Sequence, residues 1–176
     1  MFPDEEAPLP FALLDDPLAY ILAANMRHRA LCAMLRRIAT ERIASRLEAD
    51  RIIACLTIEW PLHREDEGLD LFPSLRRRAL PADELGVTLA CLDAQHRRSA
   101  AMAEIIVEAL SSRPADAVVP VDVRTSEVMQ AYVANELRRI ALENGVVLAL
   151  APIRLTRPDQ RAISRAMKAR RGVVDA

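Results

Sequence analysis

The sequence predicts an all-α protein: an antiparallel up-down-up-down four-helix bundle with an N-terminal arm and a short C-terminal helix. The 176 residues are rich in Ala, Leu, Arg and Glu and include only four Gly, a composition that favours helix. Apolar residues recur at three- and four-residue spacing through four long stretches, without the alternation typical of strands. The stretches are joined by short connections, which favour antiparallel neighbours.

The predicted organisation is an arm over residues 1–16, a bundle over 17–155, and a C-terminal helix with its tail over 156–176. The Pro-rich, acidic arm is expected to lie across the bundle. Asp16 followed by Pro17 is a typical helix start, and the first helix should run from there to the mid-40s. His28 lies on one flank of its predicted apolar face, which comprises Leu18, Leu22, Asn25, Cys32, Leu35 and Ala39.

The second helix is predicted over residues 48–67, with its end marked by Gly68 and Pro73. Pro61 lies inside it and should remove a backbone hydrogen bond, bending the helix just before His63. His63 and Glu67 are four residues apart, so an imidazole and a carboxylate share one helical face. The same face continues through the apolar residues Ile53, Leu56 and Trp60.

The third helix should begin at Pro81–Asp83, and a linker is expected from Ser111 to Pro120. A fourth helix over residues 123–150 would be ended or bent by Pro152. A terminal helix over 157–171 would be capped by Thr156 and closed by Gly172. The third helix places His96 on its apolar face, and the fourth aligns polar residues at four-residue spacing, namely Asn135, Arg139 and Glu143.

Composition excludes several function classes. A net charge of −1 and 3% aromatic residues argue against nucleic-acid binding. The acidic N-terminus does not resemble a signal peptide, and no stretch is apolar enough to predict a membrane span. Cys32, Cys55 and Cys91 lie at no metal-like spacing, which predicts buried free thiols in a reducing cytoplasm.

The predicted core contains polar residues that need partners. His28, His63 and His96 are the only histidines, one on each of three helices, and the core also receives Glu67 and Glu143. Burying two unpaired carboxylates costs several kcal/mol each. A divalent metal would neutralise them, and so would the Arg139 guanidinium. Two simpler interpretations also remain: singly satisfied core histidines, and an ordinary surface pair between Arg139 and Glu143.

With these motifs in place, the chain from Pro17 to Gly172 resembles the hemerythrin-like (HHE cation-binding) domain family. The resemblance is carried by His63-x-x-x-Glu67 with the Asp70-Leu71-Phe72-Pro73 that follows. It is also carried by His96 before Arg97-Arg98, by the run from Ile140 to Leu148, and by the tail from Leu155 to Gly172. The likeness implies a bundle whose interior holds a carboxylate-bridged di-iron site.

The resemblance implies that His63, Glu67, His96 and Glu143 are metal ligands. Two further histidines of the family pattern are replaced, one by Asn25 and the other by Arg139. In a different register of the first helix, His28, which precedes Arg29, would supply the missing ligand directly. A fixed guanidinium at a metal position would repel an ion and neutralise the carboxylates itself.

Three functions follow as expectations. The first is a non-haem iron (or other divalent metal) protein, mono- or di-nuclear, that senses or handles O₂, NO or iron. The second is a metal-free regulatory or scaffolding bundle in which Arg139 neutralises the former bridging carboxylates. The third, an enzyme using residual mononuclear iron, ranks last because the sequence indicates no substrate pocket.

Overall fold

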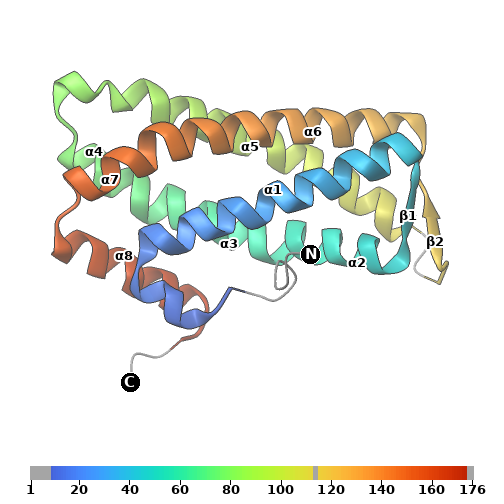
Figure 1. Ribbon diagram of the computed structural model, residues 1–176, viewed down its shortest axis with the longest axis horizontal. Coiled ribbons are helices and arrows are strands. Elements are labelled where there is room, and N and C mark those ends of the chain that lie inside the picture. Colours follow the sequence, from blue (N-terminus) through green and yellow to red (C-terminus); the bar gives the residue numbers. More distant parts are fainter. Residues whose placement is uncertain (1–8, 113–114, 174–176) are drawn as a thin grey trace.

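The computed structural model describes residues 9–112 and 115–173, and within these residues the protein is all-α apart from one short ladder. Its longest helices are α1 (Pro17–Glu41), α5 (Leu85–Ser111) and α6 (Val123–Leu142). These helices extend along the long axis of the molecule, with the segment α2 to α4 beside them (Figure 1). The predicted all-α class is therefore confirmed. None of the described helices is long and apolar enough to cross a membrane.

The second helical segment is longer than predicted. It continues past residue 67 to Arg78 as α2 (Arg46–Ala54), η2 (Cys55–Glu59), α3 (Trp60–Glu65), η3 (Asp66–Leu71) and α4 (Phe72–Arg78). The predicted stop at Gly68 and Pro73 is wrong because η2 and η3 are π-helical turns. Their last bonds reach five residues back, from the Trp60 and Phe72 N–H groups, so the proline that follows each turn is accommodated without ending the helix.

The fourth helical segment also contains a π-helical turn. α6 passes through η5 (Glu143–Val147) into α7 (Leu148–Arg154), and Pro152 lies inside α7 without ending it. Thr156 then caps α8 (Arg157–Arg170) in a capping box with Asp159, as predicted. Gly172 follows with a φ of 68°, a left-handed conformation that glycine adopts without strain.

A small ladder connects two of the loops at one end of the molecule (Figure 1). β1 (Ile43–Ser45) pairs with β2 (Val118–Pro120) in antiparallel register, with Ala44 opposite Val119. The sequence predicted no strand, and this prediction is wrong. Three-residue strands between helices are too short to show a period-two pattern, so pattern reading misses them.

The N-terminal arm is described only from residue 9, so most of the predicted arm lies outside the described residues. Its described part contains the short 3₁₀ helix η1 (Phe11–Asp15), which contacts α8. Asp16 then caps α1 as predicted, because its carboxylate accepts a hydrogen bond from the Ala19 N–H at 3.0 Å. A second short 3₁₀ helix, η4 (Pro81–Asp83), precedes α5.

The structure corrects two predictions about which side chains are buried. Leu22 is 45% exposed, whereas Ile21, Asn25 and His28 are buried, so the inner face of α1 is rotated from the predicted one. Asn25 and His28, the two candidate site residues of this helix, therefore both point inward. Among the thiols, Cys32 is buried but Cys55 is half-buried and Cys91 is exposed, since Cys91 lies off the apolar face of α5.

The interior is divided into two apolar cores with a polar layer between them. The ladder-side core is formed around Leu35, Ile52, Ile106 and Met129. The α8-side core contains buried residues from α1, α4, α5, α7 and α8. α6 packs against both α1 and α5, and α2 packs against α5. Each long segment passes from one core to the other, so its middle residues contribute to the polar layer.

Candidate functional site

The Arg139 guanidinium lies at the centre of the polar layer. Arg139 is fully buried, although a buried arginine is rare unless its charge is paired. Its Nε donates to Glu136 Oε2 at 3.0 Å and its Nη1 to Glu143 Oε2 at 2.5 Å. The guanidinium carbon also lies 4.4 Å from the centre of the Trp60 ring, within range of a cation–π interaction.

Glu67 joins the second helical segment to the third. His63 Nε2 lies 2.5 Å from one of its carboxylate oxygens, and His96 Nε2 lies 2.9 Å from the other. Arg139 Nη1 is 3.6 Å from the oxygen that faces His63. The predicted His63–Glu67 pair therefore exists, and the Glu67 carboxylate contacts two imidazoles and lies beside a guanidinium.

Asn25 uses both ends of its amide. Its Nδ2 donates to Glu143 Oε2 at 3.1 Å and to Asn144 Oδ1 at 2.9 Å. Its Oδ1 accepts a hydrogen bond from Arg139 Nη2 at 3.1 Å and lies 3.2 Å from His63 Nε2. An aliphatic side chain could neither accept from the guanidinium nor donate to the carboxylate.

His28 belongs to a neighbouring part of the layer, centred on Glu136. Its Nε2 lies 3.0 Å from both Glu136 Oε2 and the Tyr132 hydroxyl. Its ring stacks on Trp60 with centroids 3.9 Å apart. Ser99 donates to the other oxygen of Glu136. His28 therefore contacts Glu136 and not Glu67.

The pKa shifts of the carboxyl groups differ in direction. Burial opposes ionisation of Glu136, but Arg139 and His28 outweigh it and lower the pKa of this carboxyl to about 2. Burial also opposes ionisation of Glu67, yet His63 and Arg139 hold its pKa well below the ordinary value. Burial and then the negative charge of Glu67 raise the pKa of Glu143 well above the ordinary value. The pKa values of the neighbouring Glu67 and Glu143 carboxyls are therefore shifted in opposite directions.

The His28 imidazole is kept neutral. Burial lowers its pKa, and this effect exceeds the opposing influence of Glu136. Burial likewise raises the pKa of the Tyr132 hydroxyl well above its ordinary value, with the Glu136 charge acting in the same direction. These shifts move the titration of both His28 and Tyr132 away from neutral pH.

The donor set does not suit the carboxylate-bridged di-iron centre that the resemblance implies. A guanidinium bonded to Glu143 and 3.6 Å from Glu67 occupies the position between the carboxylates. A metal ion at this position would lie beside a fixed cation and would lack two of the histidine ligands that the resemblance implies. Single-ion binding has a geometric basis, since His63, Glu67 and Glu143 each offer an atom within 4.8 Å of the others. Such an ion would have to displace Arg139 from Glu143.

The sequence-predicted residues converge only in part. The structure brings together His63, Glu67, His96 and Glu143, and places His28 on a separate carboxylate. Sequence reasoning missed Glu136, which pairs with both Arg139 and His28. One signal was available: Glu136 precedes Arg139 by three residues, a spacing that places both on one helical face.

Comparisons of the chain with protein-family models, with curated proteins and with solved structures each gave no match. The hemerythrin-like assignment is accordingly a proposal that rests on the motif residues of the sequence.

Proposed function

We propose that this protein is a metal-independent regulatory or scaffolding bundle of hemerythrin-like type, in which Arg139 takes the place of the metal. One observation carries the proposal: a fully buried guanidinium bonded to Glu136, Glu143 and Asn25. The guanidinium lies beside both carboxyl groups that a metal would otherwise bridge, bonded to Glu143 and 3.6 Å from Glu67.

The finer fold assignment belongs to the same proposal. We interpret the helices as an antiparallel up-down-up-down four-helix bundle formed by α1, α2–α4, α5 and α6–α7. The packing of α6 against α1 and α5, and of α2 against α5, supports this interpretation. A cytoplasmic location is also proposed, from three cysteines that are free in the structure.

Metal analysis tests the proposed function directly. Protein purified without chelator from iron-supplemented cells should contain no stoichiometric metal, because the Arg139 guanidinium already lies at the carboxyl groups that would bind the ion. Its melting temperature should be the same with and without EDTA. One bound equivalent of iron per chain, or a melting temperature that falls when EDTA is added, would overturn the proposal.

The second candidate function is binding of a divalent metal such as iron, with O₂ or NO as a small ligand. It is favoured by the convergence of His63, Glu67 and Glu143 ligand atoms within 4.8 Å. Under this function, the double variant Asn25→His with Arg139→His should take up iron and gain a di-iron absorption band. The single variant Asn25→His is the matched control, since it leaves the guanidinium in place. Stoichiometric iron in the wild-type protein would favour this candidate over the first.

A further inference from the structure

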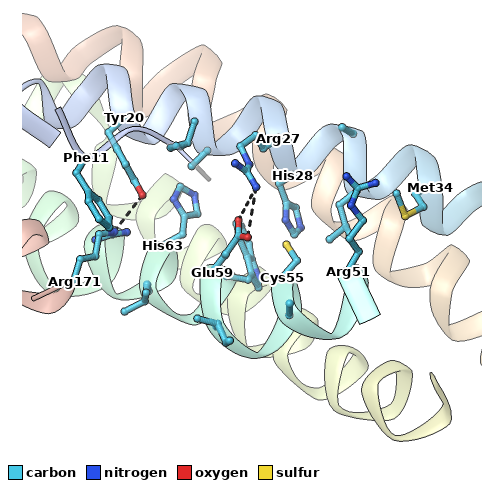
Figure 2. Close-up of a pocket in the computed structure, with 18 residues that line it drawn as sticks. Phe11, Tyr20, Arg27, His28, Met34, Arg51, Cys55, Glu59, His63 and Arg171 are labelled. Atoms are coloured by element: carbon cyan, nitrogen blue, oxygen red, sulfur yellow. Dashed lines mark hydrogen bonds and ion pairs between the residues drawn. The ribbon is translucent and has the colours of Figure 1, made fainter. Parts of the chain in front are cut away.

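A groove of about 620 Å³ runs along the seam between α1 and the α2–α3 segment. Figure 2 shows side chains from both segments lining it, with Phe11 and Arg171 towards one end and Met34 and Arg51 towards the other. Its α1 lining extends from Tyr20 to Met34, a span of roughly 21 Å at 1.5 Å per residue. The guanidinium at the centre of the polar layer is not part of this lining.

Small side chains leave the groove open. Ala24 and Ala30 of α1 and Ala54 of α2 line it, and alanines leave space between two helices that larger residues would fill. Phe11 is 56% exposed and Ile58 is 61% exposed, so apolar surface remains uncovered at the groove. Such surface indicates that the groove has an occupant, but it does not specify which one.

The described chain begins inside this groove. Leu9 and Phe11, which precede α1, both line it, and Leu9 is half-buried. Pro10 between them has an extended backbone, with φ at −63° and ψ at 134°. Residues 1–8, which lie outside the described residues, are therefore joined covalently to a segment that already lies in the groove. This link gives residues 1–8 a high effective concentration at the groove, which favours them over any separate molecule.

The length of residues 1–8 suits the groove. An extended chain advances about 3.3 Å per residue, so eight residues reach roughly 26 Å, more than the roughly 21 Å of the α1 lining. Proline at positions 3 and 8 favours an extended backbone. In that conformation the acidic run at residues 4–6 would lie roughly 10–17 Å from Leu9, within the length of the groove.

The composition of residues 1–8 is complementary to the lining. An apolar pair at residues 1–2 precedes three consecutive carboxylates at residues 4–6. The lining is mostly apolar and also contains Arg27 and Arg51. Arg27 Nη2 donates to Glu59 Oε2 at 3.1 Å, but a guanidinium has five N–H donors, so this bond does not prevent contact with a second carboxylate.

The inner wall of the groove contains polar atoms that suit a peptide backbone. Trp60 and His63 are buried and line the groove, and Trp60 Nε1 and His63 Nδ1 have no hydrogen-bond partner among the described residues. Buried polar atoms of native proteins are nearly always paired. An extended segment presents N–H and carbonyl groups along its length, so it can supply a donor or an acceptor to this wall.

We propose that residues 1–8 of this chain occupy the groove as an autoinhibitory contact. The apolar pair at residues 1–2 lies towards the Met34 end, and the carboxylates of residues 4–6 lie beside the guanidiniums of Arg27 and Arg51. The groove is then closed to other molecules until the segment leaves it. This inference does not depend on the proposed role of Arg139, because that residue does not line the groove.

Paramagnetic relaxation enhancement shows where the segment lies. A nitroxide is attached to Asp4→Cys in the full chain, with Cys91→Ser removing the exposed thiol. Burial raises the pKa of the Cys55 thiol to about 12, so this thiol reacts slowly with the label. Amide signals of residues 27–34 and 51–58, on the two walls, should lose most of their intensity. Weak broadening spread evenly over the protein would overturn the proposal.

A pair of variants tests the groove itself. Ala54→Phe fills the groove from an exposed position of α2 and should abolish the strong broadening. Ala101→Phe, at an exposed position of α5 away from the groove, should leave it unchanged. Circular dichroism checks that both variants are folded. Unchanged broadening in Ala54→Phe would overturn the proposal.

A second pair of variants tests the charge complementarity. Glu5→Lys combined with Glu6→Lys should also abolish the broadening, because it places cations beside the guanidiniums of the lining. Glu104→Lys combined with Glu108→Lys makes the same change in net charge at exposed positions of α5 and should have no effect. Equal broadening in both double variants would overturn the assignment of the carboxylates to Arg27 and Arg51.

Two other results would assign the groove to a different occupant. Spin-labelled chains mixed with separate isotope-labelled chains should cause no specific broadening. If they do, the segment of one copy occupies the groove of another, and the intramolecular contact is overturned. A native mass above that of the chain, absent in Ala54→Phe, would assign the groove to a copurified small molecule and would likewise overturn the proposal.

Discussion

At the scale of single residues, Asn25 and Arg139 act as a complementary pair. The guanidinium offers donors in a planar fork, and the Asn25 carbonyl accepts from one arm while its amide donates to Glu143. The two residues are therefore in direct contact, although they are 114 residues apart in the sequence.

Replacing Arg139 by methionine should destabilise the protein by about 3–5 kcal/mol, because it leaves buried carboxylates without their cation. Urea unfolding at neutral pH measures the change in the free energy of unfolding. Arg37→Met is the control: Arg37 forms exposed ion pairs with Glu41 and Glu48, and its loss should cost less than about 1 kcal/mol. Similar stability for the Arg139→Met variant and the wild type would show that the guanidinium does not hold the layer together.

Replacing Glu136 or Glu143 by the neutral glutamine should change the stability of the protein by different amounts. Glu136 has its pKa lowered from 4.5 to about 2, so its charge contributes stability above pH 4.5 that is lost as the pH falls towards 2. Glu136→Gln should therefore cost roughly 3 kcal/mol at neutral pH. The measurement is the free energy of unfolding of each variant between about pH 2 and pH 8, which includes the folded and unfolded pKa values of Glu136.

Ionisation of Glu143 affects the stability of the protein in the opposite direction. Its pKa is raised in the folded protein, so the folded state binds its proton more tightly than the unfolded chain does, and stability falls as the pH rises above 4.5. Glu143→Gln mimics the protonated form and should cost little at neutral pH, while it removes that decline. Equal losses for Glu136→Gln and Glu143→Gln at neutral pH would contradict this division of roles.

At the scale of elements, the π-helical turns η2, η3 and η5 are placed beside the polar layer. η2 ends one residue before Trp60, η3 contains Glu67, and η5 begins at Glu143. A wide turn changes the angle at which the following side chains project, so each turn adjusts how its segment faces the layer. The sequence prediction assumes a fixed helical period of 3.6 residues. It therefore predicts a helix end at a position where the helix continues through a wider, π-helical turn.

The docking of α8 depends on a buried carboxylate in one of these turns. Arg171 Nη2 donates to Asp66 Oδ2 at 2.5 Å, and Arg170 reaches both Asp66 and Asp70. Burial raises the pKa of Asp66, and Arg171 only partly offsets this effect. The predicted terminal helix is thus attached to the molecule by ion pairs in addition to the apolar contacts of Ile163 and Met167.

Asp66→Ala should loosen α8, because it leaves the Arg171 guanidinium without its carboxylate partner. Amide hydrogen exchange should show faster exchange across α8, with little change in α5 and α6. Asp93→Ala provides the comparison, since its ion pair with Arg76 is exposed and its loss should not affect α8. Unaltered protection of α8 in Asp66→Ala would mean that apolar packing alone holds this helix.

At the scale of the whole molecule, the all-α class could be predicted because it rests on composition and on long periodic stretches. The burial of His63, Glu67, His96 and Glu143 followed from the same periodicity. The partner of each group could not be predicted, since a sequence does not state which of several buried carboxylates a guanidinium reaches. Glu136 shows this: only the packing of α6 against α1 brings it to His28.

The two apolar cores should unfold together. The polar layer contacts both of them, and every long segment passes through it, so neither core is expected to survive without the other. Hydrogen exchange of the most protected amides in α1 and α5 should therefore report one free energy of opening, equal to that from urea unfolding. A distinctly lower value for amides in the α8-side core would show that the cores are separate units.

The position of Arg139 has a consequence for how the fold depends on its surroundings. A bound metal contributes stability by mass action, so that contribution rises and falls with the free concentration of the ion. A cation that is part of the chain is present at one copy per site from synthesis onwards, and no chelator, oxidant or shortage can remove it. Under the proposed function, assembly of this core is therefore constitutive, and its stability is unlinked from the supply of metal.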